Sequence, residues 1–356
     1  QKTAYEIGVR LVGSEMCIRD RYVMLPKDYC IFKLSGEIVS DPLSNIGLVD
    51  NNLKYIDDLL SLVSGAPAKL PPLKKMTEQV GVIKKELPFN GTKIINGTMD
   101  AWIGILGSGG FENKKNIYLS GTSEILGINS KEVIPTPGII IFPEDENIKL
   151  HAGPTQSGGA SKLWFCNLFN LTPLEMNKLV ENENFNDVSP IFLPHLQGER
   201  APLWNPNLKG IFYGMNSKTN KGNLARSVYE GVSFSAKLIL ESLEKSSNCI
   251  NEEINCGGGG FQADIWNQIR ANILNKKINR LSIKDPGILG SVGIAGYGSG
   301  TFSNIDEAFN EMTSFDKFYE PDQNLKNYYS DLYEIFKNIT ESNIKISEKF
   351  SKFSRN

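Results

Sequence analysis

Three glycine-rich stretches of the sequence have residue types that could bind a phosphate, and each follows a segment with the pattern of a strand. The first contains Gly121, Thr122 and Ser123, between two short β-patterned runs. Glycine lets the backbone come close to an anion, while Thr and Ser add hydroxyl donors. This turn is therefore a candidate phosphate loop, and a plain hairpin turn is the alternative.

Four consecutive glycines, residues 257–260, form the second stretch. They lie between an expected strand at 253–256 and a helix that begins within 261–266, a layout that can cradle a nucleotide. The spacing fits neither the GxGxxG fingerprint nor the P-loop. A flexible connection is the alternative, although four glycines cost conformational entropy that a mere connection need not incur. The run is thus a candidate nucleotide-binding loop.

The third stretch, residues 153–161, reads GPTQSGGAS and runs into the apolar residues 163–165. It can form the N-terminus of a helix, whose backbone N–H groups would face a phosphate or a ribose. Capping of that helix by Ser157 is the alternative. In the first interpretation the N–H groups of the helix N-terminus bind a ligand, and in the second the Ser157 side chain accepts one of them.

Asp100 is the one carboxylate placed just after an apolar β-run, at Ile94 and Ile95, and just before a glycine-containing helix pattern. Transfer of a phosphoryl group to a hydroxyl needs a base beside that hydroxyl, and a single well-placed Asp suffices. A helix cap is the alternative for an isolated Asp at such a position. His151 and His195 are the only histidines, so a His-based triad or metal site has little to draw on, and we expect both to be structural.

Length and composition narrow the class of protein. At 356 residues the chain exceeds what one core usually holds, so we expect two domains. No run approaches the roughly 20 apolar residues that span a bilayer, so a membrane protein is not expected. Lys and Arg (38) nearly balance Asp and Glu (40), without a basic stripe, which argues against a nucleic-acid partner. The five cysteines are widely spaced and odd in number, so we expect reduced thiols in the cytoplasm and no zinc site or disulfide framework.

The elements that must position these residues can be read from the hydrophobic pattern. Residues 1–21 show no period, so we expect a foreign or disordered tail, with a short helix as the alternative. Helices are predicted at about 25–34 and 50–62, then strands at 117–119, 125–127, 138–142 and 148–150, then core helices at 223–243 and 325–339. The change from helices to strands marks a domain boundary near residue 113.

One longer segment, Gly210–Glu230, resembles the C-terminal signature of the FGGY carbohydrate kinases at every constrained position. The matching residues are Gly210, Phe212, Gly214, Met215, Asn223, Leu224, Ser227, Val228, Tyr229 and Glu230. Just upstream, residues 192–204 are similar to the family's proline-bounded GER-x-P segment, and Leu25–Tyr29 is similar to its LPKDY helix. The resemblance extends from residue 22 to about Phe350, which is nearly the whole chain.

The resemblance implies a role for each candidate residue. Asp100 would be the catalytic base, and the second phosphate loop would consist of Gly121, Thr122 and Ser123. Gly159 would contact the nucleotide, and the adenosine loop would consist of Gly258, Gly259 and Gly260. No protein ligand for a metal is assigned. The sequence departs from the family at Phe261, where a small residue is usual.

The resemblance also implies the fold, two α/β domains of the ribonuclease H-like type shared with actin and hexokinase. Family members begin with a strand and an Asp-x-Gly-Thr turn that binds phosphate and magnesium, and no such turn precedes Asp100. We therefore expect a truncated chain, in which 22–113 is the remnant of the first domain and 114–350 is the nucleotide-binding domain. Because phosphoryl transfer depends on positioning and on charge neutralisation by Mg²⁺, this chain should be nearly inactive alone.

The function implied by the resemblance is phosphorylation of a sugar hydroxyl by ATP with Mg²⁺. A pentulose such as D-xylulose is the leading substrate, and glycerol, another polyol or another ketose is the alternative. A non-catalytic nucleotide- or sugar-binding module of the same fold is a different class of function. The expected partners are thus a sugar and ATP, and the oligomeric state is open, with a homodimer as one candidate.

Overall fold

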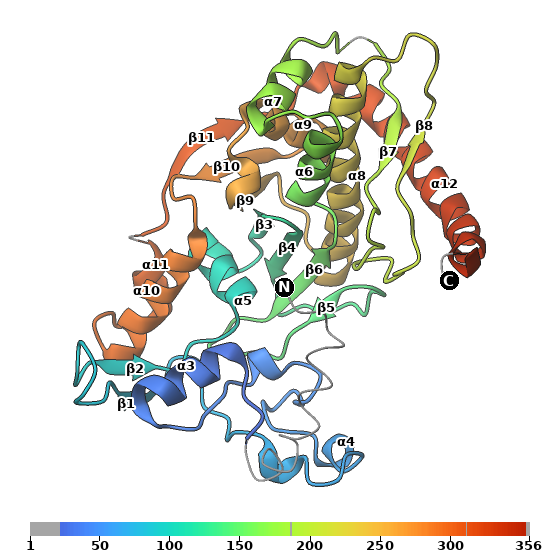
Figure 1. Ribbon diagram of the computed structural model, residues 1–356. Coiled ribbons are helices and arrows are strands. Elements are labelled where there is room, and N and C mark those ends of the chain that lie inside the picture. Colours follow the sequence, from blue (N-terminus) through green and yellow to red (C-terminus); the bar gives the residue numbers. More distant parts are fainter. Residues whose placement is uncertain (1–21, 186, 311, 354–356) are drawn as a thin grey trace. The chain divides into compact units, whose positions relative to one another are not determined.

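The computed structural model describes residues 22–185, 187–310 and 312–353 (Figure 1). The chain forms two compact units, one up to Met99 with Ile294–Ser303, and one of Asp100–Gly293 with the residues from Asn304 on. The tail predicted for residues 1–21 lies outside the described residues. Within the described ranges, no helix is both long enough and apolar enough to cross a membrane.

The first unit begins with helix α3 (Pro26–Ser35), which confirms the helix expected at about 25–34. Pro26 suits the first helical position because its missing N–H has no partner there anyway. The helix ends at Gly36, whose φ of 90° gives the left-handed conformation that favours glycine. The unit also contains α4 (Asp57–Leu60) and an antiparallel strand pair, β1 (Gln79–Val82) and β2 (Lys93–Ile95). β2 contains the β-run expected at Ile94 and Ile95, whereas no strand was expected at β1.

The prediction of a helix over residues 50–62 was wrong. The Asp50 carboxylate accepts hydrogen bonds from the backbone N–H groups of Asn52 (2.8 Å) and Lys54 (3.0 Å), which closes a turn instead of a helix. Leu53 has a positive φ of 61° within this turn. Only α4 is helical; Leu60 within it is buried, whereas Leu62 and Val63 beyond it are exposed, so the apolar spacing does not continue as one buried face.

A seven-stranded sheet organises the second unit, in the order β11-β10-β9-β3-β4-β6-β5. The strands are β3 (Asn116–Ser120), β4 (Glu124–Asn129), β5 (Ile140–Ile141), β6 (Leu150–Thr155), β9 (Glu253–Gly257), β10 (Lys277–Leu281) and β11 (Phe315–Tyr319). The strands predicted between 117 and 150, and at 253–256, are confirmed, although β6 continues to Thr155, past the expected end. A smaller antiparallel pair, β7 (Ile191–Leu193) and β8 (Ile211–Tyr213), lies apart from this sheet.

Strand direction places the three glycine-rich stretches at one edge of the sheet. β3 and β9 are parallel neighbours, and β6 runs in the same direction as β3 because both are antiparallel to β4. The carboxyl ends of β3, β6 and β9 therefore meet at the same edge. The turn after each of these strands is one of the three candidate loops.

Helix α8 (Lys221–Ser247) packs on one face of this sheet (Figure 1). It begins after Asn220, whose side chain accepts the N–H of Asn223 at 2.8 Å while the Asn223 side chain accepts the N–H of Asn220. Its apolar face, which includes Ile239, packs with strand residues such as Leu126 in one buried cluster. The predicted core helix at 223–243 is thus confirmed and extends further.

The remaining helices pack around these elements (Figure 1). They are α5 (Asp100–Ile105), α6 (Gly159–Leu168), α7 (Pro173–Glu181), α9 (Asp264–Leu274), α10 (Pro286–Ser299), α11 (Ile305–Asn310) and α12 (Lys326–Phe350). α12 confirms the helix predicted at 325–339. α5 continues into a π-helical turn, Leu106–Gly110. A Cβ on Gly104 of α5 would lie 3.0 Å from Leu119 Cδ1 of β3, which is a tight contact.

Replacing Ile239 by Ala should lower the free energy of unfolding by about 2–5 kcal/mol, because the side chain is fully buried between α8 and the sheet and its loss leaves a cavity. Ile346 on α12 is 59% exposed and provides the control, with an expected change within about 0.5 kcal/mol for Ile346→Ala. Urea denaturation followed by circular dichroism measures both. Equal midpoints for the two variants would contradict the packing of α8 described above.

Candidate active site

The first and third glycine-rich stretches are joined through their backbones. The N–H of Gly159 donates to the carbonyl of Gly121, and the N–H of Ala160 donates to the carbonyl of Thr122, both at 2.9 Å. A Cβ on Gly159 would lie 2.5 Å from the Gly121 oxygen, so only glycine permits this approach. The N-terminus of α6 and the turn after β3 therefore form one surface.

Neither interpretation offered for the third stretch describes it fully. Ser157 does not cap α6, because its hydroxyl donates to the Pro194 carbonyl (3.1 Å) and to Glu199 Oε2 (2.8 Å). The N–H groups of Gly159 and Ala160 are not free either, since the carbonyls of the neighbouring turn accept them. The start of α6 therefore holds the candidate phosphate loop through these two hydrogen bonds. The same two N–H groups are not available to bind a ligand.

The four-glycine loop packs against the end of β3. A Cβ on Gly258 would lie 2.5 Å from the Ser120 carbonyl oxygen, and a Cβ on Gly260 would lie 1.9 Å from Ser120 Oγ. Gly258 also has a φ of 96°, which other residues rarely adopt. A Cβ on Gly259 would meet no neighbouring atom within 4 Å, so the backbone of Gly259 is open on the side where a side chain would project.

These three stretches surround a cavity of about 480 Å³. Five predicted site residues line it: Gly121, Thr122, Gly159, Gly259 and Gly260. Three others, Ser123, Gly258 and Asp100, do not. The volume is in the range of small-molecule sites.

The cavity is also lined by residues that sequence reasoning did not single out. Lys162 of α6 and Asn177 of α7 line it beside Trp266 of α9. Asn177 Oδ1 accepts hydrogen bonds from Lys162 Nζ (3.0 Å) and from the Tyr229 hydroxyl (2.5 Å). Lys162 Nζ lies 5.9 Å from the Trp266 ring centroid, and burial lowers the pKa of this lysine. This part of the lining thus combines a buried aromatic ring with polar side chains.

Asp100 is the first residue of α5, and its side chain is exposed. Its Oδ1 accepts the N–H of the adjacent Ala101 at 2.7 Å. An N-cap side chain instead accepts the N–H of the second or third residue ahead, so this contact is not that of a cap. The carboxylate is therefore accessible to a ligand from solvent.

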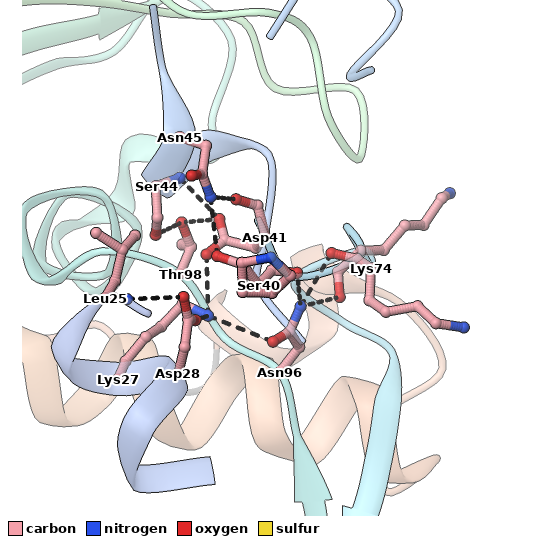
Figure 2. A network of polar contacts seen from close by, with 12 residues as sticks. Leu25, Lys27, Asp28, Ser40, Asp41, Ser44, Asn45, Lys74, Asn96 and Thr98 are labelled. Carbon is pink, nitrogen blue, oxygen red and sulfur yellow. Dashed lines mark hydrogen bonds and ion pairs between the residues drawn. The ribbon is translucent and has the colours of Figure 1, made fainter. Parts of the chain in front are cut away.

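A buried polar network in the first unit holds the segment that precedes Asp100 in the sequence (Figure 2). Thr98 Oγ1 donates to Asp41 Oδ1 at 2.6 Å, and Lys27 Nζ forms ion pairs with Asp41 Oδ2 (3.0 Å) and Asp28 Oδ1 (2.8 Å). Both carboxylates are buried, and Asn96 donates to the backbone around them. Residues 96–98 are thus fixed within their own unit, by contacts that the sequence pattern did not reveal.

Glu199 organises the loop between β6 and α6. Its Oε1 accepts the Thr155 hydroxyl and the Gln156 N–H, both at 2.7 Å, and its Oε2 lies 3.1 Å from His195 Nδ1. Burial alone would raise the pKa of Glu199, but the hydrogen bond and charge of His195 and the other donors lower it below its usual value. Among the described residues, both histidines serve structure: His151 is buried between the Ser246 hydroxyl and the Ser130 carbonyl.

Residues 117–299, more than half of the chain, match the family model described as the FGGY family of carbohydrate kinases, C-terminal domain. The chain belongs to the FGGY family of carbohydrate kinases. The matched range includes all three glycine-rich stretches and the segment Gly210–Glu230 that first suggested the family.

Individual FGGY kinases agree with this assignment. The xylulose kinase of Bacillus subtilis (strain 168) is 25% identical over 347 residues, which cover 94% of this chain and 69% of that protein. The crystal structure of a ligand-bound xylulose kinase from Lactobacillus acidophilus superposes with a TM-score of 0.82 at 26% identity, covering 91% of this chain and 68% of that one. A gluconate kinase structure from the same organism gives a TM-score of 0.82 at 27% identity, with the same coverage. The expected α/β fold of the actin and hexokinase type is thereby confirmed.

Phe261, the departure from the usual FGGY pattern, is fully buried next to the four-glycine loop. Its ring meets the Tyr118 ring edge to face, with centroids 5.0 Å apart, and the Arg270 guanidinium lies 4.2 Å from its centroid. The larger side chain is accommodated behind the loop and does not line the cavity. The larger side chain at position 261 therefore does not cover the glycine backbone that borders the cavity.

Replacing Gly260 by Ala should destabilise the protein by about 1–3 kcal/mol, because the new Cβ would overlap Ser120 Oγ. Ser120 cannot simply rotate away, since its hydroxyl is buried and bonded to Glu124 at 2.6 Å. Gly259→Ala is the matched control and should change stability by no more than about 0.5 kcal/mol, because its Cβ would meet open space. Thermal unfolding of both variants decides the matter, and a Gly260→Ala melting temperature equal to that of wild type would contradict the close contact between the loops.

Proposed function

We propose that this FGGY kinase transfers the γ-phosphate of ATP to a sugar hydroxyl, with a pentulose such as D-xylulose as the leading substrate. The observation that carries the proposal is the convergence of three glycine-rich stretches on one cavity of about 480 Å³ in a member of this family. The xylulose kinases among its relatives favour a pentulose. The gluconate kinase, with the same TM-score, keeps other sugars as alternatives, and a glycerol kinase among the relatives keeps glycerol or another polyol.

The nucleotide would occupy the cavity of the second unit. Thr122 and Ser123 supply hydroxyl donors and Gly121 supplies a bare backbone for the phosphates. Gly258, Gly259 and Gly260 would border the adenosine, and Gly159 would contact the nucleotide where α6 meets the phosphate turn.

Mg²⁺ would enter with the phosphates of ATP, where it neutralises the charge of the transferred group. The described residues include no group of three or more His, Cys, Asp or Glu side chains that could hold a metal ion. We therefore assign no protein ligand to it. The chain itself would position the phosphates of ATP.

Asp100 is our proposed catalytic base. The sugar hydroxyl oxygen would attack the γ-phosphorus, the bond to the bridging oxygen of ADP would break, and the hydroxyl proton would pass to the Asp100 carboxylate. The exposure of this side chain and its single short contact with Ala101 N–H support the role, because the carboxylate can accept a proton from a bound substrate.

A coupled assay of ADP release by the complete gene product tests the proposal directly. ADP release that depends on D-xylulose, and exceeds the release with gluconate or glycerol, is the expected result. Nucleotide binding without ADP release on any sugar or polyol would favour the non-catalytic binding module. Faster turnover of gluconate or glycerol would retain the kinase and reassign its substrate.

Asp100→Asn in the complete gene product should lower the turnover number by about 10²- to 10⁴-fold, because the hydroxyl must then lose its proton without a base. ATP affinity should stay near normal, since Asp100 does not line the nucleotide cavity. Steady-state kinetics and calorimetry measure the two quantities.

The matched control is Asp57→Asn, because Asp57 is also an exposed first residue of a helix, α4. Its turnover should equal that of wild type. If Asp100→Asn loses ATP affinity while its turnover at saturating substrates stays normal, the assignment of the base is wrong.

A further inference from the structure

We infer that Arg270 is a positioning residue that sets the distance between the two glycine loops of the nucleotide cavity, and that Glu124 holds Arg270 in place. This inference rests on the proposed function, since it assumes that the cavity between these loops binds ATP. Neither side chain lines the cavity. Arg270 and Glu124 would therefore affect ATP binding only through the residues to which they are hydrogen-bonded.

One guanidinium reaches both loops. Arg270 Nη1 donates to the Gly260 carbonyl at 2.9 Å, inside the four-glycine loop. Arg270 Nη2 donates to Ser120 Oγ at 3.1 Å, at the base of the turn that begins with Gly121. The rigid, planar fork of Arg thus fixes two separate segments relative to each other, which a flexible point charge could not do as well.

Glu124 fixes the guanidinium from the other side. Its Oε1 accepts Arg270 Nη2 and the Ser120 hydroxyl, both at 2.6 Å, and its Oε2 accepts the Tyr118 hydroxyl at 2.5 Å. The side chains of Glu124 and Arg270 are both fully buried. Because Tyr118 and Ser120 both belong to β3, the carboxylate ties the guanidinium to the strand that leads into the phosphate turn.

The guanidinium also contacts an aromatic ring of the cavity lining. It lies 3.9 Å from the centroid of the Trp266 ring and 4.2 Å from that of Phe261. Trp266 lines the cavity, so the position of Arg270 would also affect where this ring lies. The large Phe261 ring fits behind the loop because the guanidinium covers it.

Stability alone does not account for such a pair. The desolvation of two buried charges offsets most of their attraction, and replacing a buried ion pair with apolar residues of similar volume is often neutral or stabilising. What the pair supplies is geometry: hydrogen bonds from one planar group to both loops. We therefore expect its removal to affect nucleotide binding even when the fold is preserved.

The experiment measures ATP affinity by calorimetry and the melting temperature for the chain and three variants. Arg270→Met breaks the pair and leaves Glu124 buried without its partner. Glu124→Leu combined with Arg270→Met replaces both members with apolar residues of similar size. Arg226→Met is the matched control, because Arg226 forms another buried ion pair, with Glu230 at 2.8 Å, and among the described residues none of its bonding partners lines the cavity.

Arg270→Met should weaken ATP binding about 10- to 100-fold and lower the melting temperature. The double variant should recover much of the melting temperature and still bind ATP about 10-fold or more weakly. Arg226→Met should lose melting temperature and keep wild-type ATP affinity. This combination separates positioning from stability.

A double variant that melts like wild type and binds ATP with wild-type affinity would overturn the inference. An equal loss of ATP affinity in Arg226→Met would also overturn it, because the effect would then follow stability alone. If the wild-type chain itself binds no ATP, the proposed nucleotide site fails and this inference fails with it. Normal ATP binding by both wild type and Arg270→Met would refute the positioning role alone.

Discussion

The main-chain contact between the ends of β3 and β9 constrains the rest of the second unit. These strands are parallel neighbours, and the loop after β9 passes so close to Ser120 that a Cβ on Gly258 or Gly260 would overlap it. Glycine is therefore required at both positions for packing alone. The neighbouring Gly259 has an open backbone and lines the cavity, so the same short loop supplies both a tight packing contact and part of the cavity surface.

Buried charge supports each of the loops that this constraint brings together. Glu124 and Arg270 connect the turn after β3 with the loop after β9, and Glu199 gathers the turn after β6 through Thr155 and Gln156. Loops at a sheet edge have few apolar contacts to hold them, whereas a buried carboxylate can order several N–H and O–H donors at once. Helix α8 supplies the apolar backing, and its Ile239 lies against Gly153 of β6.

The sequence was informative wherever local physics decides the outcome. The apolar face of 223–243 and the short apolar runs at β3 and β4 predicted elements that exist, because most of these side chains are buried in the structure. The expected helix over 50–62 failed because the Asp50 side chain bonds to the backbone two and four residues ahead, a competing contact that apolar spacing does not record. The glycine stretches were recognised from composition. That they meet depends on strand order, which no local pattern contains.

The residues that sequence reasoning missed share one property: their partners are distant in the chain. Arg270 and Glu124 are 146 positions apart, and nothing in either helix or strand pattern marks them as a pair. Phe261 looked like an isolated departure from the family, yet it packs between Tyr118 and Arg270 and depends on both. The departure is therefore one part of a set of contacts behind the loop.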